Sequence, residues 1–84
     1  MLKRSEKPEE LKIATNVMGE PVGLTRNGRR ERVVAIYERW RLDDEWWGKE
    51  EKRCYFKIRT SQGFVCDIYH ETVAGRWYLY KIYD

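Results

Sequence analysis

The chain has 84 residues, of which 37% are charged and 14% are aromatic, and its formal net charge at neutral pH is +3. This length gives one small domain that buries only about 60% of the surface its unfolded chain exposes, so four Trp, six Tyr and two Phe are needed to build the core. The composition excludes a membrane-spanning helix, which needs about 20 apolar residues in a row, and a net charge of +3 does not by itself indicate a nucleic-acid partner.

The N-terminal part divides into a polar segment and two short apolar ones. Residues 1–10 alternate in charge and contain one proline, so we expect a mobile leader before a single domain over residues 11–84. No apolar run follows the first residues, as a signal peptide would require, and we therefore expect a cytoplasmic protein with no membrane partner. Alternating apolar residues predict a strand over 11–19, and residues 21–25 are compatible with a short second strand.

The next segment begins with Asn27-Gly28, which predicts a tight hairpin turn because both residues tolerate positive φ. Residues 30–40 are rich in Val, Ile, Tyr and Trp, which favour a half-buried strand. Positions 33, 36, 37 and 40 also fit one face of a helix, so the spacing leaves both structures open. The β-branched residues and the preceding turn favour the strand.

Three further strands are predicted over residues 52–60, 64–70 and 76–84, with turns at 61–63 and 71–75. In the first of these strands, alternation places Phe56 and Ile58 on one face and Lys57 and Arg59 on the other. In the second, Phe64, Cys66 and Ile68 share a face and Asp67 lies on the other. In the third, one face has Trp77 and Leu79, and the other has Tyr78, Tyr80 and Ile82. The predicted fold is all-β: a small antiparallel barrel or strongly bent sheet, SH3-like in style, with five to six short strands.

The stretch "WRLDDEWWG" at 40–48 surrounds three consecutive acids with Trp40, Trp46 and Trp47. An acidic catalytic or metal site is disfavoured, because adjacent carboxylates point different ways and no second acidic cluster completes a site. We expect a structural corner, in which the stretch is a polar turn between two strands and the tryptophans fold over one end of the core. A partner-docking surface is the alternative, because exposed Trp and Arg anchor many interfaces.

The cysteines and the single histidine do not form a recognisable site. Cys54 and Cys66 flank the turn at 61–63 several residues out of register, so we expect no disulfide. With His70 they provide too few ligands and no C-x-x-C pair for zinc. Cys66 and His70 lie about 13 Å apart along a strand, beyond hydrogen-bond reach for nucleophilic catalysis. We expect no enzyme, no metal and no cofactor.

Two sets of residues are candidates for binding. The candidates for fold-defining or protein-docking residues are Trp40, Arg41, Trp46, Trp47, Trp77 and Tyr78. Around the Asn-Gly turn stand Arg26, Arg29, Arg30 and Arg32, which could contact nucleic-acid phosphates next to stacking aromatics. The alternative for the second set is a solvated hairpin that only aids solubility.

Residues 30–84 resemble a known module through "WRLDDEWW", "RCYFKIRTSQG" and "GRWYLYKIYD" in this order. The pattern is similar to the C-terminal module of ImuB-like Y-family DNA polymerase homologues, and equally to small free-standing bacterial proteins of an uncharacterised domain family. The resemblance implies a role in SOS-type mutagenic translesion synthesis, where the ImuB-like hub recruits a RecA-like accessory protein and an error-prone replicative-type polymerase. Palm, fingers and little-finger regions are missing from these 84 residues, so only the binding capacity of the module is carried over.

The sequence therefore predicts a non-enzymatic protein-interaction module, monomeric or weakly homodimeric, that is accessory to DNA repair. The alternative function is a small nucleic-acid-binding barrel that uses the basic hairpin and nearby aromatics.

Overall fold

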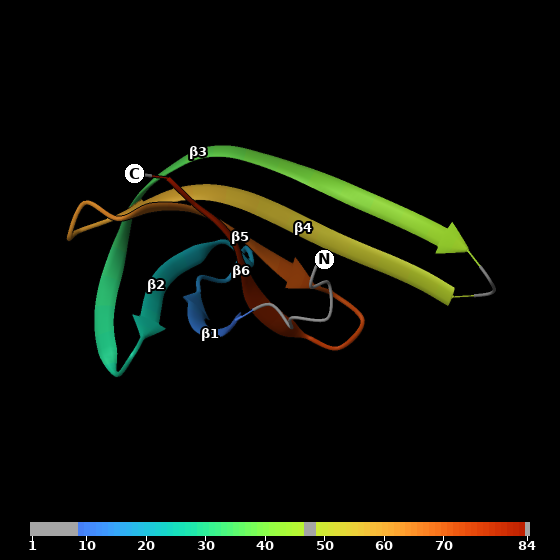
Figure 1. Cartoon of the computed structure of the whole chain (residues 1–84), viewed down its shortest axis with the longest axis horizontal. Helices are drawn as coiled ribbons and strands as arrows, with labels where there is room; N and C mark the ends of the chain where they lie inside the picture. Colours follow the sequence, from blue (N-terminus) through green and yellow to red (C-terminus); the bar gives the residue numbers. More distant parts are fainter. Residues whose placement is uncertain (1–8, 47–48, 84) are drawn as a thin grey trace, which may run out of the picture.

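A computed structural model describes the backbone over residues 9–46 and 49–83, and the side chains over 9–43 and 52–83. The elements are β1 (Glu9–Thr15), β2 (Pro21–Arg26), β3 (Arg29–Trp46), β4 (Lys49–Thr60), β5 (Val65–Glu71) and β6 (Arg76–Tyr83). These strands form one closed barrel in chain order (Figure 1). The predicted all-β barrel is confirmed, and the helix alternative for 30–40 is excluded.

The barrel closes where β1 meets β6. Each strand pairs antiparallel with the next along the chain, and Glu9–Leu11 pair with Trp77–Leu79 to complete the ring. Closure leaves the paired edges of β1 and β6 covered, which removes the open edge that a bent sheet would expose. Because β1 begins at Glu9, its first two residues belong to the segment expected as a leader, and residues 1–8 lie outside the described part.

The core contains the side chains that the strand alternation assigns to one face. Its buried members are Leu11, Leu24, Phe56, Ile58, Cys66, Ile68 and Trp77. Ile58 lies opposite Cys66, and Phe56 lies opposite Ile68, so these side chains meet on the inner face of the sheet. The predicted separation of these residues from Lys57, Arg59 and Asp67 is confirmed.

Two turns set the registers of their hairpins. Asn27 and Gly28 adopt φ of 52° and 77°, as the predicted tight turn between β2 and β3 requires. Between β4 and β5, the Oγ1 atom of Thr60 accepts hydrogen bonds from the backbone N–H of Gln62 at 3.3 Å and of Phe64 at 3.2 Å. The Thr60 side chain is 1% exposed, so these bonds lie in a place shielded from water.

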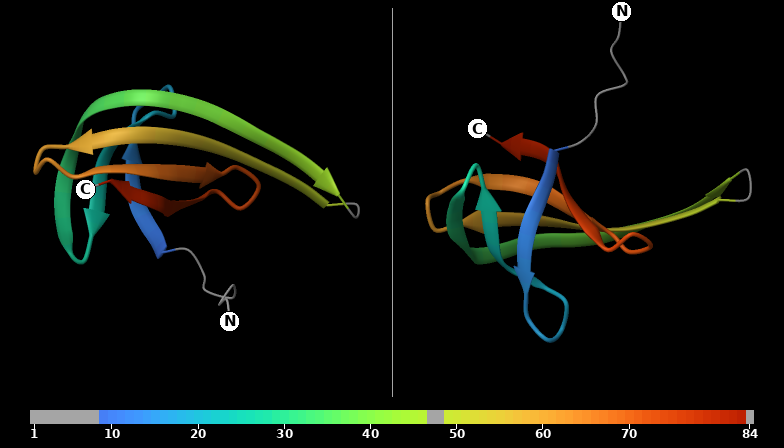
Figure 2. Two further views of the ribbon diagram at one scale, coloured as in Figure 1. Left: turned by 45° about the horizontal axis from the view of Figure 1, so that its top comes forward. Right: turned by 90° about the horizontal axis from the view of Figure 1, so that it is seen from below.

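The predicted corner at 40–48 is wrong. Residues 40–46 are the end of the 18-residue strand β3, and they pair residue by residue with 49–55 of β4. The distal part of this hairpin projects beyond the other strands (Figures 1 and 2). The pairs Trp40–Tyr55 and Asp43–Lys52 favour this extension of the strand. Farther along the hairpin acids pair with acids, at positions 44 with 51 and 45 with 50, which does not favour it. The rest of the predicted corner, residues 47–48, lies outside the described residues.

A β-bulge in β6 changes which residues share its outer face. Asp67 pairs with Lys81 and Ile68 with Leu79, so Tyr80 is an extra residue on the β6 side. After the bulge, Ile82 pairs with the buried Cys66. The prediction that Tyr78, Tyr80 and Ile82 share one face is therefore wrong for Ile82, because one inserted residue reverses the parity of those that follow.

The buried core predicts a sharp difference between two truncations. We expect Ile68→Ala, at a side chain with 0% exposure, to lower the free energy of unfolding by about 2–5 kcal/mol, because it leaves a cavity. Val73→Ala, at a side chain that is 68% exposed, is the control and should change it by less than about 0.5 kcal/mol. Urea denaturation measures both, and equal losses would contradict the described core.

Candidate functional site

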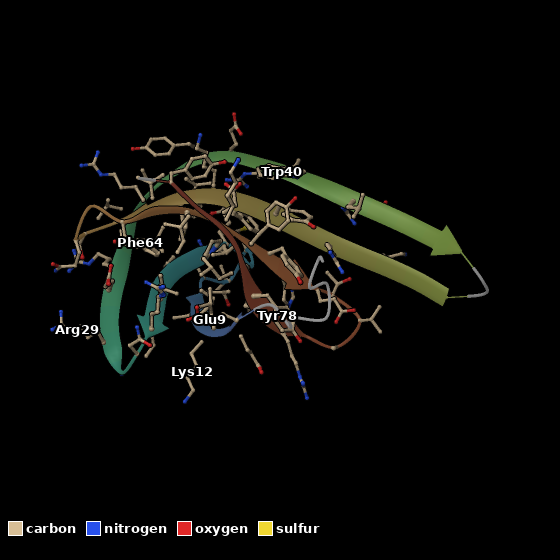
Figure 3. The ribbon with its side chains drawn as sticks, viewed as in Figure 1. Glu9, Lys12, Arg29, Trp40, Phe64 and Tyr78 are labelled. Atoms are coloured by element: carbon tan, nitrogen blue, oxygen red, sulfur yellow. The ribbon has the colours of Figure 1, made fainter. Side chains whose placement is uncertain are left out.

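A row of aromatic side chains crosses four strands on the outer surface of the barrel. Trp40 of β3, Tyr55 of β4, Tyr69 of β5 and Tyr78 of β6 lie directly opposite one another in successive pairs. The ring centroids are 5.2, 5.1 and 5.3 Å apart in that order, and the Trp40 and Tyr55 rings are stacked within 7° of parallel. We call these four residues the aromatic row; Figure 3 labels Trp40 and Tyr78 at its two ends.

Two more side chains cover the middle of the aromatic row. The ring of Tyr80 meets Tyr55 edge-on at 5.1 Å and Tyr69 at 6.3 Å. The Arg53 guanidinium lies 4.7 Å from the centre of the Tyr69 ring, and its Nη1 donates a hydrogen bond of 3.2 Å to the Tyr55 hydroxyl. Tyr55 and Tyr69 are consequently only 5% and 4% exposed, although they lie outside the barrel. Burial raises the pKa of the Tyr69 hydroxyl, which therefore stays protonated.

The exposed part of this surface is apolar at its β3 end and its β6 end. Trp40 is 38% exposed, Leu42 of the same strand is 40% exposed, and Tyr80 is 57% exposed. Leu42 follows Trp40 at the next position of the same parity, so both side chains lie on the outer face of β3. Buried rings thus support exposed ones, which fixes their orientation before any partner binds.

Charged side chains of both signs border the aromatic row. On one side, successive cross-strand partners are Leu42, Arg53, Glu71 and Arg76, and on the other side they are Glu38, Lys57, Asp67 and Lys81. The two borders together hold four cations and three anions. Because opposite signs alternate within each border, the surface carries no single-sign field that would attract a polyanion.

Tyr83 and Asp67 fix one of these borders. The Tyr83 hydroxyl donates a 2.8 Å hydrogen bond to Oδ2 of Asp67, whose side chain is 3% exposed. The Nζ atoms of Lys57 and Lys81 lie 4.4 and 5.1 Å from the centre of the Tyr83 ring. The hydrogen bond to Asp67 is the main cause that raises the pKa of Tyr83 to about 12. The hydroxyl therefore remains a donor at neutral pH, and the border keeps its arrangement.

The predicted docking residues do not all meet at one place. Trp40 and Tyr78 belong to the aromatic row, but Trp77 is buried in the core, 5.7 Å from Phe56. Trp77 therefore belongs with the fold-defining residues. Arg41 lies opposite Cys54, so its side chain lies on the face of β3 away from Trp40. Trp46 ends β3, but its side chain is outside the described part of the structure, as is the whole of Trp47.

The four arginines of the β2–β3 hairpin separate into two pairs. Arg26 pairs with Arg29, and both lie on the same face as the buried Leu24. The Arg26 side chain forms an ion pair with Glu9, with 3.5 Å between Nε and Oε2, and its guanidinium lies 4.8 Å from the centre of the Phe64 ring. Arg30 and Arg32 pair with Thr25 and Gly23 on the opposite face. The predicted single basic cluster is thus divided by strand alternation.

Sequence reasoning missed Tyr55, Tyr69 and Arg53, and it placed Tyr80 on one face with Tyr78 and Ile82 as a possible binding stripe. The signal was present, because a tight turn at 61–63 places Tyr55 opposite Tyr69 once the register is carried outward from Gln62. The bulge at Tyr80 had no such signal. It depends on how β6 fits the curvature of the barrel, which single-strand alternation does not encode.

The cysteines lie as the strand register predicts. Cys54 faces His70 and Cys66 faces Ile58, and both thiols are free, which confirms the expectation of no disulfide. Burial, followed by the charge of Asp67, raises the pKa of Cys66 to about 12, so this thiol is not ionised at neutral pH. His70 stacks on Trp77 at 4.6 Å, and burial lowers its pKa. Over the described residues, no three His, Cys, Asp or Glu side chains gather as a metal site would require.

Comparison of the chain with models of protein families, with curated proteins and with solved structures finds no match. None of the described segments is a helix with the length and apolarity needed to cross a membrane. The resemblance of residues 30–84 to the ImuB-like module therefore remains an expectation.

The burial of Cys66 predicts two classes of thiol. We expect Ellman's reagent to modify Cys54 of the folded protein in mildly alkaline buffer, and Cys66 only as fast as the protein unfolds. Folding raises the Cys66 pKa from 9.0 to about 12. The protonated thiol therefore contributes fully to the free energy of unfolding below about pH 9, and this contribution is lost as pH rises toward 12. The variants Cys54→Ser and Cys66→Ala separate the two rates; fast labelling of Cys54→Ser would contradict the prediction.

Proposed function

We propose that this protein is a non-enzymatic protein-interaction module whose docking surface is the aromatic row together with Leu42 and Tyr80. The observation that carries the proposal is a preorganised aromatic surface: Tyr55 and Tyr69 are 5% and 4% exposed, while Trp40, Leu42 and Tyr80 around them are 38%, 40% and 57% exposed. The barrel already has its own buried core, so core packing does not require these five aromatic side chains and one leucine on its outer surface.

The composition of the surface is typical of binding hot spots. Trp, Tyr and Arg carry most of the binding energy in protein interfaces, because each buries a large area with few rotatable bonds. Here the Trp40 ring rests on Tyr55 at 5.2 Å, and the Tyr80 ring rests edge-on against Tyr55 at 5.1 Å. A partner that covers them would lose little side-chain entropy, since the rings are already held.

The borders of the surface favour a protein over a nucleic acid as its partner. Anionic side chains alternate with the cations along each border. In β5, Asp67 lies between Lys57 and Lys81, and Glu71 lies between Arg53 and Arg76. The negative charge of these carboxylates would oppose a polyanion, although Asp67 is itself only 3% exposed. A protein segment with both signs can match the alternating charges of each border. The resemblance of the chain to the ImuB-like module supplies the setting: the partner would be a RecA-like accessory protein or an error-prone replicative-type polymerase.

The proposal predicts that the exposed rings dominate binding. We expect Trp40→Ala and Tyr80→Ala each to weaken the binding of such a protein partner about 30-fold or more, because a hot spot contributes about 2 kcal/mol or more and each 1.4 kcal/mol is tenfold. Surface plasmon resonance with the immobilised chain and each of the two purified candidate partners measures this change.

Tyr37→Ala is the matched control, because Tyr37 is 51% exposed on the same strand and makes no ring contact among the described residues. It should leave the affinity within about threefold. Binding that survives Trp40→Ala and Tyr80→Ala would rule out the docking surface. If neither candidate partner binds, the repair setting is wrong, and a displayed peptide library selected on the wild-type chain and counter-screened on Trp40→Ala still tests the surface.

A further inference from the structure

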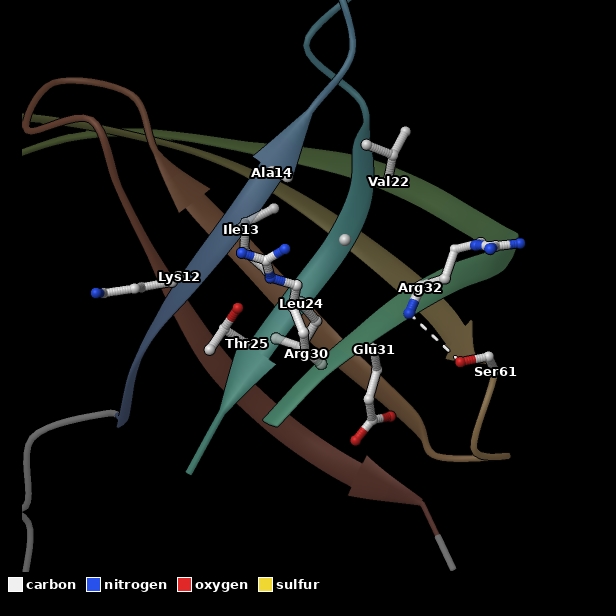
Figure 4. A pocket seen from close by; sticks show the side chains of 11 residues that line it. Lys12, Ile13, Ala14, Val22, Leu24, Thr25, Arg30, Glu31, Arg32 and Ser61 are labelled. Atoms are coloured by element: carbon white, nitrogen blue, oxygen red, sulfur yellow. Dashed lines mark hydrogen bonds between the residues drawn. The ribbon is translucent and has the colours of Figure 1, made fainter. Parts of the chain in front are cut away.

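A groove of about 830 Å³ lies over β1, β2 and the beginning of β3 (Figure 4). Its position is distinct from the aromatic row, since β2 stands across the six-stranded ring from β5. The volume is within the range of sites that hold small molecules or single chain segments. The side chains that matter for its chemistry are Lys12, Thr25, Arg30, Arg32 and Ser61.

Gly23 keeps the floor of the groove open. It lies in β2 opposite Ala14 of β1 and Arg32 of β3. A Cβ atom at Gly23 would lie 3.4 Å from the Ala14 Cβ and 3.9 Å from the Glu31 carbonyl oxygen. Its φ is not positive, in contrast to the turn glycines such as Gly28, so the backbone does not require glycine here. A strand glycine can accompany a bulge, and the register of β1 against β2 shifts directly after the Ala14–Gly23 pair. The same missing side chain leaves the backbone of β2 open to a ligand from the outer face.

Three cations border this floor on two adjacent cross-strand rows. Lys12, Thr25 and Arg30 form one row, and Arg32 lies beside Gly23 in the next. From strand geometry, the Cα atoms of Arg30 and Arg32 are about 6.6 Å apart, and those of Lys12 and Arg30 about 9.6 Å apart. The positive charges are therefore spread out, which suits an extended anion better than a single compact one.

Glu31 also lines the groove, but no ion pair among the described residues joins it to these cations. Glu31 pairs with Leu24, whose side chain is 1% exposed, so the Glu31 side chain is on the inner parity of β3. Glu10, two residues before Lys12, is the nearest acid on the same face of β1. Within the described part of the chain, no ion pair involves Lys12, Arg30 or Arg32.

Hydroxyl groups add neutral donors beside the cations. Ser61 is tied to β3, because its N–H donates to the Arg32 carbonyl at 2.8 Å and its Oγ accepts from the Arg32 N–H at 3.4 Å. Because the Ser61 Oγ accepts in this bond, its hydroxyl proton remains available to donate. Thr25 supplies a second hydroxyl between Lys12 and Arg30. Phosphate oxygens accept from such donors and from Arg and Lys alike.

We propose that this groove binds the phosphodiester backbone of a single-stranded nucleic acid. The three cations contact phosphates, and the open floor over Gly23 admits one strand. No aromatic side chain is among the described residues that line the groove. We therefore expect that bases are neither stacked nor read, and that binding is independent of base sequence. This activity adds a second partner of different chemistry to the proposed docking surface and does not depend on it.

The test is fluorescence anisotropy with labelled oligothymidylate and oligoadenylate over a series of salt concentrations. We expect the two oligonucleotides to bind alike, and the logarithm of the binding constant to fall with the logarithm of salt concentration with a slope of about −2, at roughly 0.7 per phosphate contact. Arg30→Gln combined with Arg32→Gln should reduce the slope to about −0.7. Gly23→Val, which fills the floor without a change of charge, should weaken binding at every salt concentration.

Arg29→Gln combined with Arg76→Gln is the matched control, because it removes the same charge from exposed arginines outside the groove. It should leave the slope near −2, and thermal melting checks that every variant is folded. The proposal is overturned by an absence of saturable binding at about 50 mM salt, or by an equal loss in the control. Tighter binding of duplex DNA, or equal competition by polyglutamate, would also overturn it. Trp40→Ala should leave oligonucleotide binding unchanged, so this test is separate from that of the docking surface.

Discussion

The hydroxyl of Thr60 holds the turn on which both faces of this barrel depend. It accepts from the N–H groups of Gln62 and Phe64, and with the backbone bonds of Thr60 to Phe64 and Gly63 it fixes the register of β4 against β5. That register brings Ile58 to Cys66 inside the barrel. The same register brings Tyr55 to Tyr69 outside. A slip of one residue would exchange the two sets, placing tyrosine hydroxyls in the core and aliphatic side chains in water.

The outer tyrosines are stable outside the barrel because they form a small core of their own. Arg53 donates to the Tyr55 hydroxyl and lies over the ring of Tyr69, so one side chain contacts both buried rings. The long β3–β4 hairpin contributes Trp40 to this layer. Its extended form is thus coupled to the surface that we propose as the docking site, since a turn at residue 40 would remove Trp40 from the row.

The barrel separates two surfaces of different chemistry. Aromatic side chains with alternating charges occupy the outer face from the middle of β3 to β6, and cations with an open glycine floor occupy the outer face of β1, β2 and the start of β3. Strand alternation makes this separation, because Arg30 and Arg32 point outward while Arg26 turns toward Phe64 and Glu9. These are the two surfaces that we propose for a protein partner and for a nucleic-acid strand, and their separation would let both partners bind at once.

The sequence by itself determined the all-β class, the turn at Asn27-Gly28, the inner set around Phe56 and Ile68, and the separation of the two cysteines. Those features depend on local alternation and turn chemistry, which neighbouring residues encode. Only the tertiary structure decided that residues 40–46 continue a strand, that Tyr80 is a bulge residue and that the arginines divide. These features depend on cross-strand register and on barrel curvature, which arise from pairing between segments distant in the chain.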